Sequence, residues 1–232
     1  MCACMEHKAI MEEPLRPKYF ARLDETPDSQ FYSFPRKVVH LDDAAIVAVK
    51  QFFREVLPTH GVILDLLSSW RSHWPEGLAR QRLVGLGLNA EEMADNPDLD
   101  AYIVHDINDN PHLPFEDEIF DAVVITVSIQ YVTHPIEVFR EVNRILKPGG
   151  LFAVIFSNRM FPTKAVAIWR SLNDQQHAEL IASYFQYAGN FTALDVQDRS
   201  PSATPYSDPV YVVMARRSGA GHPGDEASLR AG

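Results

Sequence analysis

The chain has 232 residues, of which 46% are hydrophobic and 22% are charged. This composition can fill a large core, and it excludes collagen-like, low-complexity and largely disordered classes of protein. The 31 acidic residues outnumber the 21 lysine and arginine residues, which gives a formal net charge of -10. Such an excess of negative charge disfavours nucleic acid and anionic lipid as partners.

The first ten residues contain no apolar segment of the signal-peptide type, and no stretch approaches the roughly 20 apolar residues of a membrane-spanning helix. We therefore expect a cytoplasmic protein without a membrane partner. Both cysteines, Cys2 and Cys4, lie in this leader, so no disulfide framework is predicted. Together with His7 they offer only three ligands, and we predict no metal site.

Residues 1–44 are predicted to form an N-terminal arm and lid, because prolines interrupt the polar leader. The segment FYSFPR at 31–36 is apolar enough to dock on the body of the protein. A helix is predicted to begin after Asp42, a favourable N-cap, and to end before Pro58. Its apolar residues recur at helical spacing and are Ile46, Val49, Phe52, Phe53 and Val56.

From Gly61 onward, short apolar runs alternate with helical stretches, a pattern typical of a parallel sheet with crossover helices. Strands are predicted at 62–67, 83–88, 102–105, 122–129 and 151–156. Before the last of these, Pro135 fits the first turn of a helix with an apolar stripe. The sequence KPGG at 147–150 is predicted to end that helix in a turn.

The remaining elements are a helix at 174–187, closed by Gly189 and Asn190, and two late strands near 194–197 and 210–215. Residues 218–232 are predicted to form a disordered tail. The body of the protein is therefore expected to span residues 45–217.

The sequence LPFEDEIFDAV at 113–123, the helix that follows Pro135 and the sequence LKPGG at 146–150 resemble class I S-adenosylmethionine-dependent methyltransferases, particularly the group called type 11. The similarity extends over residues 45–217. It implies a doubly wound α/β fold with a mostly parallel, seven-stranded sheet and an antiparallel final strand. It also implies that S-adenosyl-L-methionine is the cofactor and binds at the carboxyl ends of the first strands.

The loop after the first predicted strand departs from the family pattern. Members of this family carry Asp-x-Gly-x-Gly-x-Gly here, whereas this chain has DLLSSWRSHW at 65–74. Asp65 is retained, but Leu67, Ser69 and Arg71 occupy the glycine positions. Hydroxyl side chains can hold a ligand where relatives use the main chain. The residues of this loop that we expect at the cofactor are Asp65, Ser68, Ser69 and Trp70.

The next two strand ends carry the other cofactor positions that the resemblance implies. Gly87 stands where relatives place an acidic residue for the ribose hydroxyls. Asn89 is the nearest substitute, although with Glu92 it also has the spacing of a helix-capping box, and both roles remain open. The resemblance assigns Asp106 to the adenine amino group and Ile107 to the flank of the ring, with a plain polar turn as the alternative. Ser128, after the fourth strand, is also expected at the cofactor.

Methyl transfer from a sulfonium depends mainly on placing the nucleophile, since the electrophile arrives already charged. A base with a pKa near neutrality helps when the acceptor is an amine or a hydroxyl. The candidate catalytic residues are His40, His73 and Tyr131. The candidate substrate-binding residues are Tyr32 and Arg36 in the arm, Gln130 after the fourth strand and Asn158 after the fifth. The alternative for Tyr32 is that it only anchors the arm.

These features predict an S-adenosylmethionine-dependent methyltransferase that acts on a small molecule. One alternative is an enzyme that binds S-adenosylmethionine but performs a different sulfonium reaction. Another is a non-catalytic protein that retains the fold. The altered loop and the missing ribose acid favour these alternatives, whereas Asp65 and Asp106 favour a cavity in use. The sequence does not predict the acceptor or the oligomeric state.

Overall fold

The computed structural model describes residues 16–202 and 206–219. The leader with Cys2, Cys4 and His7, and most of the tail predicted at 218–232, lie outside the described residues. None of the helices within the described ranges is long and apolar enough to cross a bilayer.

A seven-stranded sheet forms the centre of the molecule, with strand order β3-β2-β1-β4-β5-β7-β6. The strands are β1(Val62–Leu66), β2(Arg82–Gly87), β3(Ala101–Val104), β4(Phe120–Thr126), β5(Leu146–Phe156), β6(Phe191–Asp198) and β7(Tyr211–Arg217). The first five are parallel to one another, and β7 lies antiparallel between β5 and β6. This topology confirms the predicted fold. Strand order reverses between β1 and β4, the point at which open α/β sheets bind ligands.

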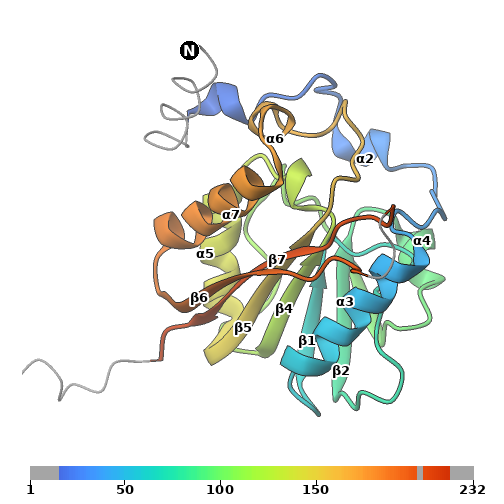
Figure 1. Cartoon of the computed structure of the whole chain (residues 1–232), viewed down its shortest axis with the longest axis vertical. Coiled ribbons are helices and arrows are strands. Elements are labelled where there is room, and N and C mark those ends of the chain that lie inside the picture. Colours follow the sequence, from blue (N-terminus) through green and yellow to red (C-terminus); the bar gives the residue numbers. More distant parts are fainter. Residues whose placement is uncertain (1–15, 203–205, 220–232) are drawn as a thin grey trace, which may run out of the picture.

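Helices cover both faces of the sheet (Figure 1). On one face, α3(Asp43–Val56) buries Val49, Phe52 and Phe53 against a core that includes Ile63 of β1. The opposite face is covered by α5(Pro135–Ile145) and α7(Asp174–Ala188). The ring of Phe139 from α5 packs edge-to-face on Phe152 of β5, with centroids 4.7 Å apart. Burial on both faces explains why the central strands have almost no polar residues.

The helix boundaries predicted from capping signals are confirmed at two places. The Asp42 side chain accepts a hydrogen bond from the Ala45 amide at 2.9 Å, so it caps α3. Pro135 occupies the first turn of α5, where its missing N–H costs nothing. The four-residue helix α2(Asp28–Phe31) and the five-residue helix α6(Ala167–Ser171) were not predicted, because they are too short for a periodic pattern, and of the five-residue helix α4(Ala90–Ala94) only the capping signal at Asn89 was recognised.

Two predicted boundaries are wrong. Residues 146–150 form the start of β5 rather than a separate turn: Leu146 already pairs with Phe120, and the register then shifts. Gly149 has a φ of 77° within this irregular part. The fourth strand also ends earlier than predicted, at Thr126, because Val127 takes a φ of 48° and turns the chain into the short helix η2(Ile129–Tyr131).

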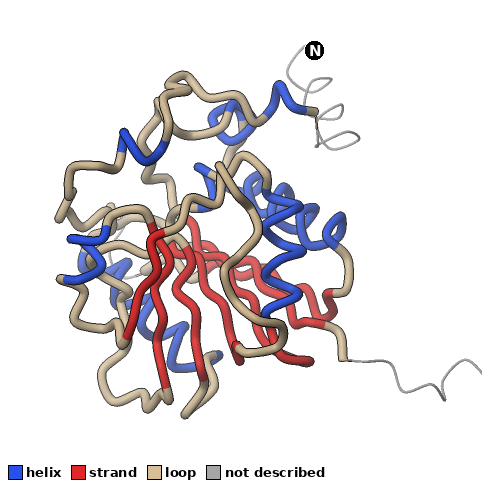
Figure 2. Tube along the Cα trace, turned by 180° about the vertical axis from the view of Figure 1, so that it is seen from behind, coloured by secondary structure: helices blue, strands red, loops and turns tan. Residues whose placement is uncertain are grey.

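Residues 16–42, which we call the arm, lie across the carboxyl ends of the strands (Figure 2). The arm includes the short helix η1(Pro17–Tyr19) and α2. Main-chain hydrogen bonds join it to the segment after β5: the Asp24 amide donates to the Thr163 carbonyl at 2.9 Å, and the Ala167 amide donates to the Ala21 carbonyl at 2.8 Å. The arm is therefore docked at its start by backbone pairing with the body.

A buried cluster of charges fixes the middle of the arm. Lys164 is fully buried, and its ammonium lies 3.2 Å from the Asp28 carboxylate and also donates to the Thr26 carbonyl. Arg22 donates to both carboxylate oxygens of Asp28 at 2.7 Å. Since an unpaired buried charge is very unfavourable, Lys164 and Asp28 each require the other element to stay in place.

We expect Lys164→Met to reduce the free energy of unfolding by about 3 kcal/mol, because it leaves the Asp28 carboxylate buried without one of its cations. The matched control is Lys147→Met, which removes a half-exposed ammonium paired with Asp121 and should cost less than about 1 kcal/mol. Urea denaturation of the two variants measures both values. Equal losses would show that Lys164 does not anchor the arm.

Candidate functional site

A cavity lies under the arm, at the carboxyl ends of β1, β2, β3 and β4, and we call it the edge cavity. Its walls come from the loop after β1, the turns after β2, β3 and β4, the arm, and the segment after β5. The predicted residues that line it are Tyr32, Arg36, His40, Asp65, Ser68, Ser69, Trp70, His73, Asn89, Asp106, Ile107, Ser128 and Tyr131. The topology thus brings together residues that are up to about 100 positions apart in the sequence.

Two predicted substrate residues lie elsewhere. Gln130 is buried behind the cavity wall, where its amide donates to the carbonyls of Val127 and Arg159 at 2.8 and 3.1 Å. These bonds tie the end of β4 to the segment after β5, so Gln130 has a structural role. Asn158 is exposed and does not line the cavity, although Arg159, Met160 and Phe161 directly after it do.

The loop after β1 is built around the buried carboxyl of Asp65. The hydroxyls of Ser68 and Ser72 both donate to the same oxygen of Asp65, at 2.7 and 2.6 Å. Asn96 in turn donates to the Ser72 hydroxyl at 2.9 Å. Leu67, at a position where the resembled family has glycine, has a φ of 64°, in the left-handed region that glycine adopts more readily than leucine. Serine side chains therefore fix the path of this loop.

Gly87 stands where the resembled family has an acidic residue for the ribose hydroxyls, and the absence of that residue has a steric explanation. The Ser68 amide donates to the Leu86 carbonyl at 2.8 Å, which brings the loop directly over the end of β2. A Cβ atom added at Gly87 would lie 2.1 Å from the Ser68 carbonyl oxygen. The loop backbone therefore leaves no room for a side chain, and hence for an acidic one, at position 87.

The start of α4 connects the arm to the loop after β1. Asn89 caps α4 by accepting from the Glu92 amide at 3.0 Å, and its amide group donates to the Tyr32 carbonyl at 2.9 Å. The Glu92 side chain does not complete a capping box. It accepts from the Ser69 hydroxyl and from the Arg36 amide, both at 2.5 Å. The capping role of Asn89 is confirmed, and Glu92 is a link between arm and loop that the sequence pattern did not reveal.

Asp106 and its neighbours form the end of the cavity below β3. One oxygen of Asp106 accepts from the Asn108 amide at 3.0 Å, which makes the polar turn expected from the sequence. Ile107 is buried beside it. The Asn108 side chain donates to Asp28 of the arm at 2.8 Å and to the Tyr131 carbonyl at 2.9 Å. Asn108 thus joins the arm to the ends of β3 and β4.

The end of β4 contributes hydroxyl groups. Ser128 donates to the Thr126 carbonyl at 3.0 Å, and the Tyr131 hydroxyl accepts from the Phe161 amide at 2.8 Å. Burial raises the pKa of Tyr131, so its hydroxyl stays protonated at neutral pH. The buried Thr126 hydroxyl has no hydrogen-bond partner among the described residues, which is unfavourable unless a bound molecule or water supplies one.

Two histidines of the cavity are neutral at physiological pH. Burial lowers the pKa of His73 to about 4, and nearby Arg71 and Lys50 act in the same direction. Burial also lowers the pKa of His40, whose ring lies edge-on to Phe161 at 5.2 Å between centroids. A neutral imidazole can accept a proton, but a lowered pKa makes it a weaker base, so His73 is a poor match for a base with a pKa near neutrality.

Trp70 and Leu67 form walls of the cavity and do not close it. The Trp70 indole donates to the Val38 carbonyl of the arm at 2.9 Å, which holds the ring at the rim. Leu67 packs on the core cluster below α5 and α7. Within the described part of the chain, no group of three or more His, Cys, Asp or Glu side chains is arranged to hold a metal.

We expect Asp65→Asn to change the pH dependence of stability. Burial raises the pKa of Asp65 to about 6, against 3.8 for an unperturbed Asp. The folded state therefore binds this proton more tightly, so the contribution of Asp65 to stability declines as the pH rises between these two values, by on the order of 3 kcal/mol. Asparagine still accepts the serine hydroxyls but does not titrate.

The free energy of unfolding of the wild type, minus that of the Asn variant, should therefore fall across this pH range and then level off. Urea titrations at a series of pH values measure it. A difference that stays constant with pH would disprove the perturbed titration of Asp65.

Comparison with protein families gives a match at residues 77–154 to the family described as "Methyltransferase domain". The C-methyltransferase UbiE of ubiquinone and menaquinone biosynthesis from Pseudomonas aeruginosa is 32% identical over 107 residues, 46% of this chain and 36% of that protein. The biotin biosynthesis bifunctional protein BioHC from Teredinibacter turnerae is 28% identical over 113 residues, 47% of this chain and 20% of that protein. The alignments thus span well under half the length of these curated relatives.

Solved structures with the same fold cover more of the chain. An S-adenosylmethionine-dependent methyltransferase from Mesorhizobium loti aligns with a TM-score of 0.52 and 19% identity, over 73% of this chain and 98% of that one. The [4+2]-cyclase SpnF aligns with a TM-score of 0.57 and 16% identity, over 94% of this chain and 97% of that one. The fold and the family match agree with the resemblance seen in the sequence. Residues 77–154 thus match a methyltransferase domain, the whole sheet has the fold of these S-adenosylmethionine-dependent enzymes, and the loop after β1 carries serines where the resembled family has glycines.

Proposed function

We propose that this protein is an S-adenosylmethionine-dependent methyltransferase that acts on a small-molecule acceptor inside the edge cavity. The observation that carries the proposal is the position of this cavity. It lies at the switch point of the sheet and is lined by polar groups from four successive strand ends. The relative UbiE, a C-methyltransferase of ubiquinone and menaquinone biosynthesis, supports a small acceptor.

The residues of the cavity fit an adenosyl ligand at its adenine end. Asp106 presents a carboxylate that can accept from the adenine amino group, beside the apolar side chain of Ile107. The unpartnered hydroxyl of Thr126, in the wall at the end of β4, calls for a polar ligand atom or a water. The ribose end differs from the family pattern, because position 87 cannot carry an acid. We assign contacts there to the hydroxyl and amide side chains of Ser68, Ser69 and Asn89.

When bound, S-adenosylmethionine supplies a methyl group attached to a positively charged sulfur. The protein has to orient the acceptor and receive its proton. Tyr131 can orient the acceptor through its protonated hydroxyl. The neutral imidazoles of His40 and His73 can take a proton from an amine or hydroxyl acceptor. The arm excludes water by covering the cavity, with Tyr32 and Arg36 on its inner side.

A second candidate function is a different reaction at the same site. SpnF, whose structure aligns over 94% of this chain, is described as a [4+2]-cyclase. In such an enzyme, the cavity would bind S-adenosylmethionine without transferring its methyl group. Position 87 has no acidic side chain that could hold the ribose hydroxyls of the cofactor. This favours the alternative, because a reaction that does not transfer the methyl group does not need the cofactor to be positioned so exactly.

Isothermal titration calorimetry with S-adenosylmethionine and S-adenosylhomocysteine tests the proposal. We expect micromolar binding of both ligands. Absence of binding at millimolar concentration would contradict it. If the ligands bind, mass spectrometry of S-adenosylmethionine during turnover distinguishes the candidates, because methyl transfer releases S-adenosylhomocysteine and a cyclisation does not.

Asp106→Asn should weaken S-adenosylhomocysteine binding by about 1 to 3 kcal/mol, because an amide is a poorer partner for the adenine amino group than a carboxylate. Asparagine still accepts from the Asn108 amide, so the turn is preserved. Asp109→Asn, an exposed change in the same turn, is the control and should leave the affinity unchanged. Calorimetry measures both, and an unaltered affinity of the Asp106 variant would reject this assignment.

A further inference from the structure

One side of the edge cavity is formed by aromatic side chains, namely Tyr32 and His40 from the arm, Tyr131 after β4 and Phe161 after β5, which we call the aromatic wall. Phe161 is its centre. Its ring lies 6.1 Å from that of Tyr131 at an interplanar angle of 29°, and 5.2 Å from His40 at 88°. Aromatic surfaces of this kind favour a planar ring as ligand, through stacked and edge-to-face contacts.

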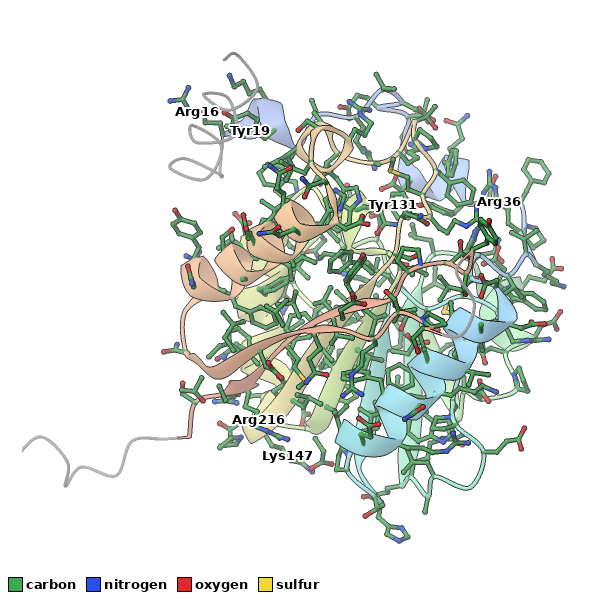
Figure 3. The ribbon with its side chains drawn as sticks, viewed as in Figure 1. Arg16, Tyr19, Arg36, Tyr131, Lys147 and Arg216 are labelled. Atoms are coloured by element: carbon green, nitrogen blue, oxygen red, sulfur yellow. The ribbon has the colours of Figure 1, made fainter. Side chains whose placement is uncertain are left out.

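The guanidinium of Arg36 lies at this wall. Its central carbon is 5.7 Å from the ring centroid of Tyr32 and 5.9 Å from that of Phe161, both of which line the cavity, and 4.3 Å from that of Phe31 behind them. Figure 3 shows Arg36 and Tyr131 at the same end of the molecule, beyond the strand ends, while Lys147 and Arg216 lie at the other end. The cation is thus held against rings that line the cavity, in a position to meet a ligand.

Arg36 has no carboxylate partner within residues 16–202 and 206–219. Its side chain donates through Nη1 to the Phe31 carbonyl at 2.7 Å, which uses one of five N–H groups. The other arginines at the cavity differ: Arg159 pairs with Asp208 at 2.8 Å, and Arg71 is exposed and lies over Trp70. A half-buried guanidinium with unused donors is suited to a planar, bidentate anion.

The charges around the cavity limit this anion to a single charge. Four acidic side chains line it, from Asp28, Asp65, Glu92 and Asp106. Asp28 is paired with Arg22 and Lys164, and Glu92 accepts two hydrogen bonds, but these groups still oppose a second negative charge nearby. A carboxylate therefore fits better than a phosphate dianion.

We infer that the aromatic wall and Arg36 form a subsite for an aromatic carboxylate, whose ring lies against Phe161 and Tyr131 and whose carboxylate pairs with Arg36. This inference rests on the proposed function, because it identifies the chemical class of the acceptor. The ring would then lie beside the neutral imidazole of His40, and an amine or hydroxyl substituent on it would be the group to be methylated.

Three probes of similar size test the subsite by NMR titration of the full chain, with and without S-adenosylhomocysteine. Benzoate carries both ring and carboxylate, benzamide lacks the charge, and cyclohexanecarboxylate lacks the aromatic ring. We expect benzoate to bind about ten- to a hundredfold more tightly than benzamide, because its carboxylate makes a charge-assisted pair with Arg36 and the neutral amide of benzamide does not. It should also bind a few-fold more tightly than cyclohexanecarboxylate.

Arg36→Gln should abolish the preference for benzoate over benzamide. Lys37→Gln is the matched control: it makes the same change of charge one residue further along the arm, but Lys37 points outward to Glu91 at 2.9 Å and Asp95 at 2.5 Å. This variant should keep the preference. Circular dichroism confirms that both variants fold, and the comparison of probes on the wild type does not depend on either.

Equal affinity of the wild type for benzoate and benzamide, or a preference that survives in the Arg36 variant, would overturn the inference. So would failure of all three probes to bind while S-adenosylhomocysteine binds normally. The opposite result, a benzoate preference that depends on Arg36 in a protein that does not bind S-adenosylhomocysteine, would support the subsite and contradict the proposed function instead.

Discussion

The site depends on the buried pairing of Asp28 with Lys164 and Arg22. This pairing holds the arm against the segment after β5, and Asn108 extends the same network to the ends of β3 and β4. Displacing the arm would separate the buried Lys164 ammonium from the Asp28 carboxylate, which is unfavourable because a buried charge needs its partner. The network turns an open sheet edge, typical of doubly wound folds, into a covered cavity with an aromatic wall.

The second constraint is the position of the glycines, which lie in β2 and not in the loop after β1. In the resembled family, glycines in the loop after β1 let the main chain approach the ligand. Here the loop carries serines and a leucine, and the glycines lie in β2. A Cβ atom at Gly87 would lie 2.1 Å from the Ser68 carbonyl oxygen, whereas one at Gly85 would first meet the Leu99 side chain at 2.6 Å and then the Ser68 hydroxyl at 3.1 Å. The close approach is therefore between loop and strand. The close packing of the loop on β2 accounts for the missing acidic residue at position 87. It also accounts for a loop without glycines whose serines are bonded to Asp65.

The sequence predicted the sheet, the main helices and most of the residues around the cavity, because buried strands and capping residues leave regular patterns. It failed where the deciding contacts are between distant segments. Nothing in the sequence around Lys164 distinguishes it from a solvent-exposed loop lysine. Glu92 has the spacing of a capping box, but its side chain accepts hydrogen bonds from Ser69 and Arg36 instead. Gln130 follows β4 as a substrate residue would, yet its amide is used by two carbonyls behind the wall. The roles of these three residues depend on how distant segments pack together, which the sequence pattern does not show.

The central claim is that the strand ends and the arm together enclose a site for an adenosyl ligand despite the altered loop. A crystal structure of the full chain grown with S-adenosylhomocysteine tests it most directly. The account predicts the adenine ring beside Asp106 and Ile107, with the arm in place above it and the ribose against Ser68, Ser69 and Asn89. A ligand bound outside the edge cavity, or side chains of Leu67 and Trp70 filling that space, would contradict it.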